Sequence, residues 1–322
     1  MLDLNKIKDK NILIISDVCL DIYEYYNSNE ISPEFPVPKA ILKSKEILLG
    51  MGSNIALNIK TLGGNPILIS NWNVEFEKQI EKYDITNRFF LTENVTYKKR
   101  ILVNSKHIIR IDKDVDFNEP TFIDWFKFKI SLLKNIDGII ISDYNRGIVK
   151  NFGNEIIKIL RKEFPNVKIL FDPHKNNKNI IDCDYFIPNW IESNILLDLK
   201  LDKNIENIKL VLEKLENKFK LPTILKLSEL GLCYHTILKL SELSYNKYRF
   251  IHLPAYKNLM IDACGCGDSL ISTLSLSLAT GLNLHKSIEL ANIAAGIAVC
   301  KQGTKPVMFE ELKKEYEEFY NG

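Results

Sequence analysis

The sequence predicts an α/β fold: a mostly parallel central sheet flanked by helices on both faces, with a small β lid. Two observations favour this fold. Short apolar runs that are typical of buried strands alternate with helical patterns between residues 121 and 227. The segments 96–103 and 106–112 have the pattern of paired strands around an Asn104-Ser105 turn. Strands that alternate with helices imply right-handed crossovers and therefore a parallel sheet.

Length, composition and charge narrow the class of protein. The 322 residues suffice for one large α/β domain or two small ones with a sizeable core. The net charge of +2 argues against a nucleic-acid partner, and no apolar run reaches the roughly 18 residues of a membrane span. We expect no signal peptide and no membrane partner. Six cysteines without a framework pattern indicate reduced thiols and a cytoplasmic protein.

The first predicted strand, at 11–16, delivers two acids to the carboxyl edge of the sheet. These are Asp17 and Asp21, which could hold a ligand or serve as ordinary turn acids. The prolines of the segment 31–38 favour an extended edge segment over a helix. Residues 40–49 then mix apolar and charged side chains, as a half-exposed strand does.

A first glycine turn, Gly50-Met51-Gly52-Ser53-Asn54, leads into a helical pattern at 55–62. Such a turn can bring the backbone close to a polar ligand. A strand follows at 66–70, and we interpret residues 71–90 as irregular apart from a short helix near 74–82.

The two predicted lid strands carry basic side chains. Period-2 alternation places Lys98 and Arg100 on one face of the first of these strands, with Arg110 on its partner. A run of this kind is often a solvated face, and the alternative is a site for an anionic ligand.

The βα region has polar groups at the ends of its strands. Four strands are predicted, at 138–142, 167–171, 185–187 and 222–227. The groups that follow them are Asp143, Asp172, Asn189 with Glu192, and Ser228 with Gly231. These groups should gather in one crevice, because the carboxyl ends of parallel strands meet at one edge. The helices expected are 121–134, 150–163, 203–219, 284–301 and 309–319. Without a repeat or linker, we expect a single domain over 1–322, with its β lid from about 17–49 and 96–112.

A second glycine turn, Asp262-Ala263-Cys264-Gly265-Cys266-Gly267-Asp268, opens a buried helical run that ends near Gly281. A glycine turn at a helix start collects unpaired N–H groups, which favour a phosphate or a developing negative charge. Asp268 could cap the helix, or it could accept a proton from a hydroxyl that attacks a phosphoryl group. Metal binding by Cys264 and Cys266 is a minor alternative, since no clear companion pair exists.

With these motifs in place, the chain resembles the ribokinase-like (phosphofructokinase-B type) sugar kinases over nearly its whole length. Asp262-x-x-Gly265-x-Gly267-Asp268 is similar to the carboxy-terminal signature of that family. Gly50-Met51-Gly52-Ser53-Asn54 is a looser match to its amino-terminal glycine motif, and Asn189-x-x-Glu192 fits its Asn-x-x-Glu element. Within the family, the segments 17–23 and 31–38 are most similar to kinases that phosphorylate D-glycero-D-manno-heptose 7-phosphate at its anomeric O1.

The resemblance implies an ATP-dependent carbohydrate kinase that uses Mg²⁺ and serves bacterial surface-glycan (nucleotide-heptose) biosynthesis. It implies Asp268 as the catalytic base and an anion hole formed by Gly265, Cys266 and Gly267. It implies ATP contacts from Asn189, Trp190, Ile191, Glu192, Lys226, Ser228, Gly231 and Asn292. It implies sugar contacts from Asp17, Asp21, Gly50, Gly52, Asn54, Lys98, Arg100 and Asp143. Asn189 and Glu192 would act on Mg²⁺ through water, and a homodimer would form through the lid.

Four features depart from the family pattern. Lys226 stands where the family generally has Thr, and Ala263-Cys264 replaces a Thr-containing pair. Cys266 replaces a small residue, and the stretch 70–90 is shorter than in relatives. Two alternatives therefore stay open: a kinase for another sugar phosphate or a nucleoside, and a catalytically idle sugar- or nucleotide-binding regulator.

Overall fold

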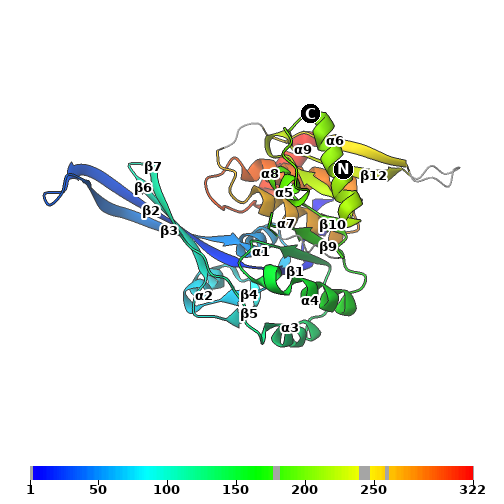
Figure 1. Cartoon of the computed structure of the whole chain (residues 1–322), viewed down its shortest axis with the longest axis horizontal. Coiled ribbons are helices and arrows are strands. Elements are labelled where there is room, and N and C mark those ends of the chain that lie inside the picture. The colour runs from blue at the N-terminus through cyan, green and yellow to red at the C-terminus, as the bar shows by residue number, and fades with distance from the viewer. Residues whose placement is uncertain (1–2, 177–181, 239–246, 258–260, 322) are drawn as a thin grey trace.

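The structure, a computed structural model, describes residues 3–176, 182–238, 247–257 and 261–321. A layered α/β body carries two smaller sheets, one of which projects far from it (Figure 1). Within the described ranges, no helix combines the length and the apolar character that a bilayer crossing requires.

The central sheet has six strands, and every pairing within it is parallel, as predicted. In spatial order the strands are β10 (Tyr185–Phe186), β9 (Ile169–Asp172), β8 (Gly138–Ser142), β1 (Asn11–Ser16), β4 (Asn65–Trp72) and β5 (Thr86–Leu91). The chain runs from β1 outward to β4 and later returns to β8 on the other side. The carboxyl end of β1 is therefore a topological switch point, where open α/β sheets bind their ligands.

Helices cover both faces of this sheet. In β1, Ile12 and Ile14 belong to one hydrophobic cluster and Leu13 and Ile15 to the other, as the alternation of a buried strand requires. The first cluster includes side chains of α1 (Gly52–Thr61), α2 (Val74–Ile80), α7 (Cys266–Ala279), α8 (Leu284–Ala298) and α9 (Phe309–Asn321). The second includes side chains of α3 (Phe122–Ser131), α4 (Ile148–Glu163), α5 (Trp190–Leu196) and α6 (Ile205–Phe219). Short 3₁₀ turns lie at Leu4–Ile7, Glu81–Tyr83 and Ser228–Leu230.

A four-stranded sheet, here called the projecting sheet, extends away from the body (Figure 1). Its strands, in spatial order, are β3 (Pro38–Met51), β2 (Val18–Ile31), β6 (Thr96–Val103) and β7 (Lys106–Lys113). The predicted turn between β6 and β7 is confirmed: Asn104 and Ser105 have φ of +47° and +65°, as a two-residue hairpin turn requires. β2 and β3 are buried where they join the body and exposed toward the tip, whereas β7 is exposed throughout.

Two regions differ from the sequence prediction. Residues 71–90 are not irregular beyond α2, because β5 pairs with β4 in parallel. Two further strands were missed, β12 (Leu232–Leu238) and β13 (Lys247–Leu253), which form an antiparallel sheet with β11 (Ile224–Lys226). Neither region has the continuous apolar run by which the other strands were predicted.

The turn into β12 depends on Gly231. Its φ is +85°, and a Cβ at this position would lie 2.1 Å from the Leu253 carbonyl oxygen. Only glycine fits both the backbone conformation and this close approach.

We therefore expect Gly231→Ala to lower the free energy of unfolding by more than the about 1–2 kcal/mol of left-handed backbone strain alone. Gly281→Ala is the matched control, since Gly281 has φ +81° and no atom within 4 Å of the added Cβ. Urea unfolding of both variants measures the difference. Equal losses would mean that the clash at Gly231 relaxes.

Candidate active site

The predicted site residues from several strand ends lie at one edge of the sheet, beside the second glycine turn. That turn, residues 262–268, is here called the anion turn. Gly265 precedes α7 with φ +79°, and a Cβ there would lie 2.7 Å from the Asn54 amide nitrogen. Gly52 is similarly close to Ser16, with 2.5 Å between a Cβ at Gly52 and the Ser16 Cβ. Both glycines thus let the two glycine turns approach their neighbours without a side chain between.

Asp268, in the first turn of α7, is held through both carboxylate oxygens. Asn54 donates to Oδ2 at 2.7 Å and the Tyr144 hydroxyl donates to Oδ1 at 2.6 Å. The residue is only 9% exposed. Burial raises the pKa of the Asp268 carboxyl, while these two hydrogen bonds oppose the rise because they stabilise the ionised form. This geometry suits a base that must accept a proton in a fixed orientation.

Tyr144 was not among the predicted site residues. It lies two residues beyond the end of β8, next to Asp143, which was predicted. The signal that could have found it is its place at a strand end on the same edge as the anion turn.

A largely buried ion pair lies close to the anion turn. The Lys226 ammonium at the end of β11 is 2.6 Å from Oδ1 of Asp172, at the end of β9. The Lys226 nitrogen is also 3.9 Å from where a Cβ at Gly267 would stand. A fixed positive charge therefore adjoins the anion turn.

Asn189 and Glu192 form a capping box at the start of α5. The Asn189 side chain accepts from the Glu192 N–H at 2.9 Å, and Glu192 Oε2 accepts from the Asn189 N–H at 2.7 Å. Burial raises the pKa of Glu192 to about 7, even though Lys226 opposes the rise. The loop before α5 pairs with β11, so Lys226 and Asn189 are neighbours.

These groups fit Mg²⁺ held through water rather than in a protein cage. In the part of the chain that the structure describes, no cluster of three or more acidic, His or Cys side chains could hold a metal. Mg²⁺ commonly keeps several waters and takes one or two carboxylates plus substrate phosphates. The alternative of a metal on Cys264 and Cys266 has no support among these residues.

The other predicted nucleotide residues have varied surroundings. Trp190 packs in the core, whereas Ile191 is 66% exposed. Ser228 and Gly231 both have positive φ in the turn between β11 and β12. The Asn292 amide donates to the Pro254 carbonyl at 2.8 Å.

Asp17 accepts hydrogen bonds from the backbone at and just before the start of α4. Its two oxygens accept from the N–H groups of Arg146 and Ile148, each at 3.0 Å. Burial raises the pKa of Asp17 to about 7 against these hydrogen bonds. This geometry matches the turn-acid interpretation of Asp17, and its sugar contact stays a prediction. Asp143 Oδ1 likewise accepts from the Asn145 N–H, at 2.7 Å.

Asp21 and Arg100 form an ion pair of 2.5 Å at the base of the projecting sheet. The Arg100 guanidinium also lies 4.9 Å from the Tyr23 ring centroid. Gly50 is needed there, since a Cβ at Gly50 would lie 2.4 Å from the Asp21 carboxylate. Lys98 stands opposite Asp21 in the strand register and is half-buried, whereas Arg110 pairs with Asp112.

The Arg100 charge of the projecting sheet also acts on the anion turn. Burial opposes ionisation of Asp262, yet two backbone hydrogen bonds and the Arg100 charge hold the pKa of Asp262 below its ordinary value. The Tyr23 hydroxyl lies 3.1 Å from where a Cβ at Gly303 would stand.

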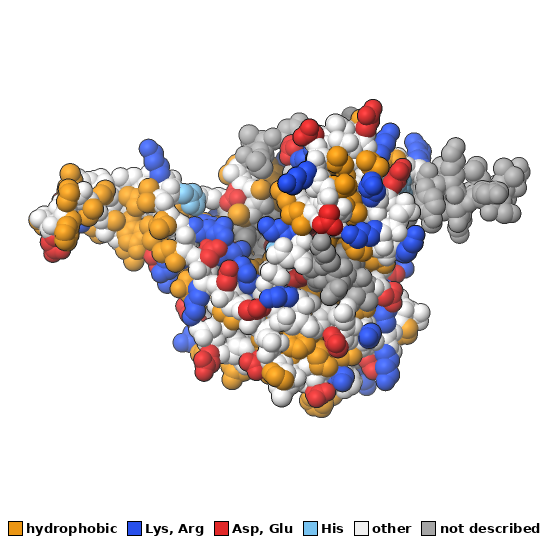
Figure 2. Space-filling model, viewed as in Figure 1, with side chains coloured by type: hydrophobic (Ala, Val, Ile, Leu, Met, Phe, Trp, Pro, Cys, Tyr) orange, Lys and Arg blue, Asp and Glu red, His pale blue; other side chains and the backbone are white. Residues whose placement is uncertain are grey.

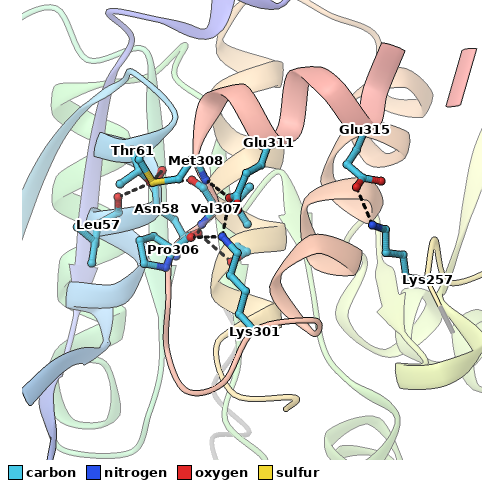
Figure 3. Close-up of polar contacts among 11 residues, drawn as sticks. Leu57, Asn58, Thr61, Lys257, Lys301, Pro306, Val307, Met308, Glu311 and Glu315 are labelled. Atoms are coloured by element: carbon cyan, nitrogen blue, oxygen red, sulfur yellow. Dashed lines mark hydrogen bonds and ion pairs between the residues drawn. The ribbon is translucent and has the colours of Figure 1, made fainter. Parts of the chain in front are cut away.

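The loop 301–308 is bonded to α1 and α9 (Figure 3), and it is also bonded to the anion turn. The Thr61 hydroxyl donates to the Val307 carbonyl at 2.7 Å, and Asn58 Oδ1 accepts from the Val307 N–H at 3.0 Å. The Lys301 ammonium is 2.5 Å from the Glu311 carboxylate. Asp262, at the start of the turn, accepts from the Gly303 N–H at 3.0 Å. The anion turn is therefore bonded to the loop 301–308, which is itself held by α1 and α9.

This fold, with a held carboxylate at a glycine turn on the switch-point edge, defines a sugar kinase of the ribokinase-like class. The chain belongs to the pfkB family of carbohydrate kinases, whose profile matches residues 9–310. The predicted family and the predicted ATP-dependent carbohydrate kinase are confirmed at this level.

Curated relatives are about 30% identical to the chain. The bifunctional protein HldE of Helicobacter acinonychis (strain Sheeba) is 30% identical over 318 residues, which cover 94% of this chain and 65% of that protein. The bifunctional protein HldE of Haemophilus influenzae (strain PittGG) is 31% identical over 316 residues, covering 95% of this chain and 63% of that protein. The chain thus spans less than two thirds of the length of these relatives.

Solved structures confirm the ribokinase-like fold. Phosphofructokinase-2 from Escherichia coli in complex with potassium matches with a TM-score of 0.74 at 14% identity, covering 97% of this chain and 99% of that one. Ribokinase of Arabidopsis thaliana complexed with ribose and ATP matches with a TM-score of 0.70 at 15% identity, covering 95% of this chain and 98% of that one.

The hydrogen bond from Tyr144 predicts a pH effect. It stabilises ionised Asp268, so Tyr144→Phe should raise the pKa of that carboxyl and move the acidic limb of kcat to higher pH. The ring packing is retained, so the Michaelis constants should change little. A kcat–pH profile of the variant beside the wild type measures the shift.

Tyr320→Phe is the matched control, because the Tyr320 hydroxyl donates at the same 2.6 Å to a carboxylate of Glu289, away from the anion turn. An acidic limb that moves equally in both variants, or in neither, contradicts a specific role for Tyr144.

Proposed function

We propose that the chain transfers the γ-phosphoryl group of ATP to the anomeric O1 of D-glycero-D-manno-heptose 7-phosphate, giving the 1,7-bisphosphate. The observation that carries the kinase chemistry is Asp268, held by Asn54 and Tyr144 at the anion turn. The heptose assignment is supported by the resemblance of the segments 17–23 and 31–38 to heptose 7-phosphate kinases, and by the HldE relatives.

In this mechanism Asp268 takes the proton from O1 as the O1–phosphorus bond forms and the bond to ADP breaks. N–H groups of Gly265, Cys266 and Gly267, at the start of α7, stabilise the charge on the transferred group. Mg²⁺, held through water by Asn189 and Glu192, would neutralise charge on the ATP phosphates.

We expect Asp268→Asn to reduce turnover about 10²–10⁴-fold while nucleotide binding stays within a few-fold of the wild type, because only the base is lost. A panel of sugar phosphates, neutral sugars and nucleosides, assayed by ADP release, identifies the acceptor. Turnover of the nucleosides alone would favour the nucleoside-kinase alternative. Binding of sugar or ATP without any turnover would favour the idle regulator.

The phosphate already on the sugar needs a cationic partner. We propose that Arg100 and Lys98, on one face of β6, bind that phosphate, with Asp21 orienting Arg100 through their ion pair. Arg110 is a weaker candidate, because Asp112 already holds it.

Arg100→Ala or Lys98→Ala should then lower kcat/KM for the phosphorylated sugar about tenfold or more, with little effect on the neutral sugar. Lys99→Ala is the control, since Lys99 is the adjacent residue of the same strand and pairs with Glu24 at 3.3 Å. The ratio of kcat/KM for the two sugars is the measurement. A ratio unchanged in both variants would leave the basic run as a solvated face.

We also propose a homodimer through the projecting sheet. Figure 2 shows hydrophobic surface gathered on this projecting part of the molecule. The large hydrophobic side chains exposed on the sheet and at its tip are Ile31, Phe35, Val37, Ile41, Leu42, Ile108, Ile109 and Ile111. A contiguous exposed apolar surface on a β-sheet is typical of an interaction site.

Light scattering should therefore give twice the mass of one chain, and Ile41→Lys with Ile109→Lys should give monomers. A monomeric wild type with full activity contradicts this proposal.

A cytoplasmic location is supported by the six free cysteines, which suit a reducing compartment.

A further inference from the structure

Lys226 occupies an unusual position for a lysine. Its backbone N–H donates to the Pro188 carbonyl at 2.9 Å, which places the end of β11 beside the loop that starts α5. From there the side chain reaches Asp172 at 2.6 Å and lies next to Gly267 of the anion turn. The side chains of Lys226 and Asp172 are only 16% and 14% exposed.

The ammonium is kept charged by its surroundings. Burial alone would lower the pKa of Lys226, but the charges of Asp172 and Glu192 outweigh burial and hold that pKa above its ordinary value. The cluster therefore keeps a positive charge in a place with little water, where an electrostatic contact is stronger than at the surface.

A purely structural ion pair does not account well for this arrangement. Buried lysine–carboxylate pairs contribute little stability relative to apolar residues of similar size, because both charges lose their hydration. Asp172 accepts from the ammonium, which carries three donors in all. The ammonium adjoins Gly267, where no side chain separates it from the helix N–H groups.

We propose that Lys226 is a catalytic residue that binds the phosphoryl group in transfer, from its position beside Gly267 of the anion turn. Asp172 holds the ammonium in place before the nucleotide arrives, so little reorganisation is needed when charge develops. Lys226 and the N–H groups of α7 then share the charge of the moving group. This role rests on the proposed kinase function. In that function Lys226 would supply a positive charge from the protein in addition to that of the metal.

The experiment must separate loss of the cation from loss of fold. Lys226→Met alone leaves the Asp172 carboxylate buried without its partner, and should lower the thermal midpoint. The double variant Lys226→Met with Asp172→Asn removes both charges and should recover much of that midpoint. Lys168→Met is the control, since Lys168 pairs with Asp184 at 2.8 Å just before β9, at the opposite end of that strand from Asp172.

Calorimetric titration with AMP, ADP and ATP, without Mg²⁺, gives the readout that is independent of turnover. The double variant should bind AMP within about twofold of the wild type and ATP about tenfold or more weakly. Its kcat should fall about 100-fold, whereas Lys168→Met should match the wild type in every measurement. Lys226→Arg, which keeps a cation, should retain more ATP affinity than Lys226→Met.

The inference is overturned if the double variant binds ATP as the wild type does and keeps kcat within threefold. It is equally overturned if AMP and ATP affinities fall together, because the loss would then not depend on the phosphates. Failure of the proposed function is a distinct result, in which the wild type releases no ADP with any sugar. The contrast between AMP and ATP binding would still measure how much Lys226 contributes to binding the nucleotide phosphates.

Discussion

The two hydrogen bonds on the Asp268 carboxylate are the constraint on which the site depends. Asn54 comes from α1, Tyr144 from the end of β8, and Asp268 from α7, so one side chain joins three separate parts of the chain. Burial without these donors would favour the neutral acid, which cannot act as a base. Both donors must therefore be in place for a buried carboxylate to remain useful.

Helix α1 also positions the segments around Asp268. Asn58, one turn beyond Asn54, accepts from the Ser269 hydroxyl at 2.8 Å and from the Val307 N–H at 3.0 Å. The first of these bonds fixes α7 next to Asp268, and the second fixes the loop 301–308 (Figure 3). The backbone of the anion turn is thus positioned by the same helix that positions the carboxylate.

The sequence predicted what local patterns encode. The two glycine turns, the parallel strands and the polar strand ends were recognisable because glycine, apolar runs and turn acids have local signatures. Partners across the fold were not recognisable: Tyr144 meets Asp268 across 124 residues, and Asp172 meets Lys226 across 54. Asp17 illustrates the converse: its strand-end position predicted a sugar contact, and local patterns did not reveal that both its oxygens accept from N–H groups at and just before the start of α4.

Two cations near the anion turn are each held by an acid. Arg100 is paired with Asp21 within the projecting sheet, whereas Lys226 of the three-stranded sheet is paired with Asp172 of the central sheet. Movement of the projecting sheet relative to the body would carry Arg100 and Asp21 together and leave Lys226 in place. Under our proposals, recognition of the sugar phosphate then depends on the position of the projecting sheet, whereas charge stabilisation during transfer does not. Substitutions in the sheet should alter acceptor choice, and those at Lys226 should alter the chemical step for every acceptor.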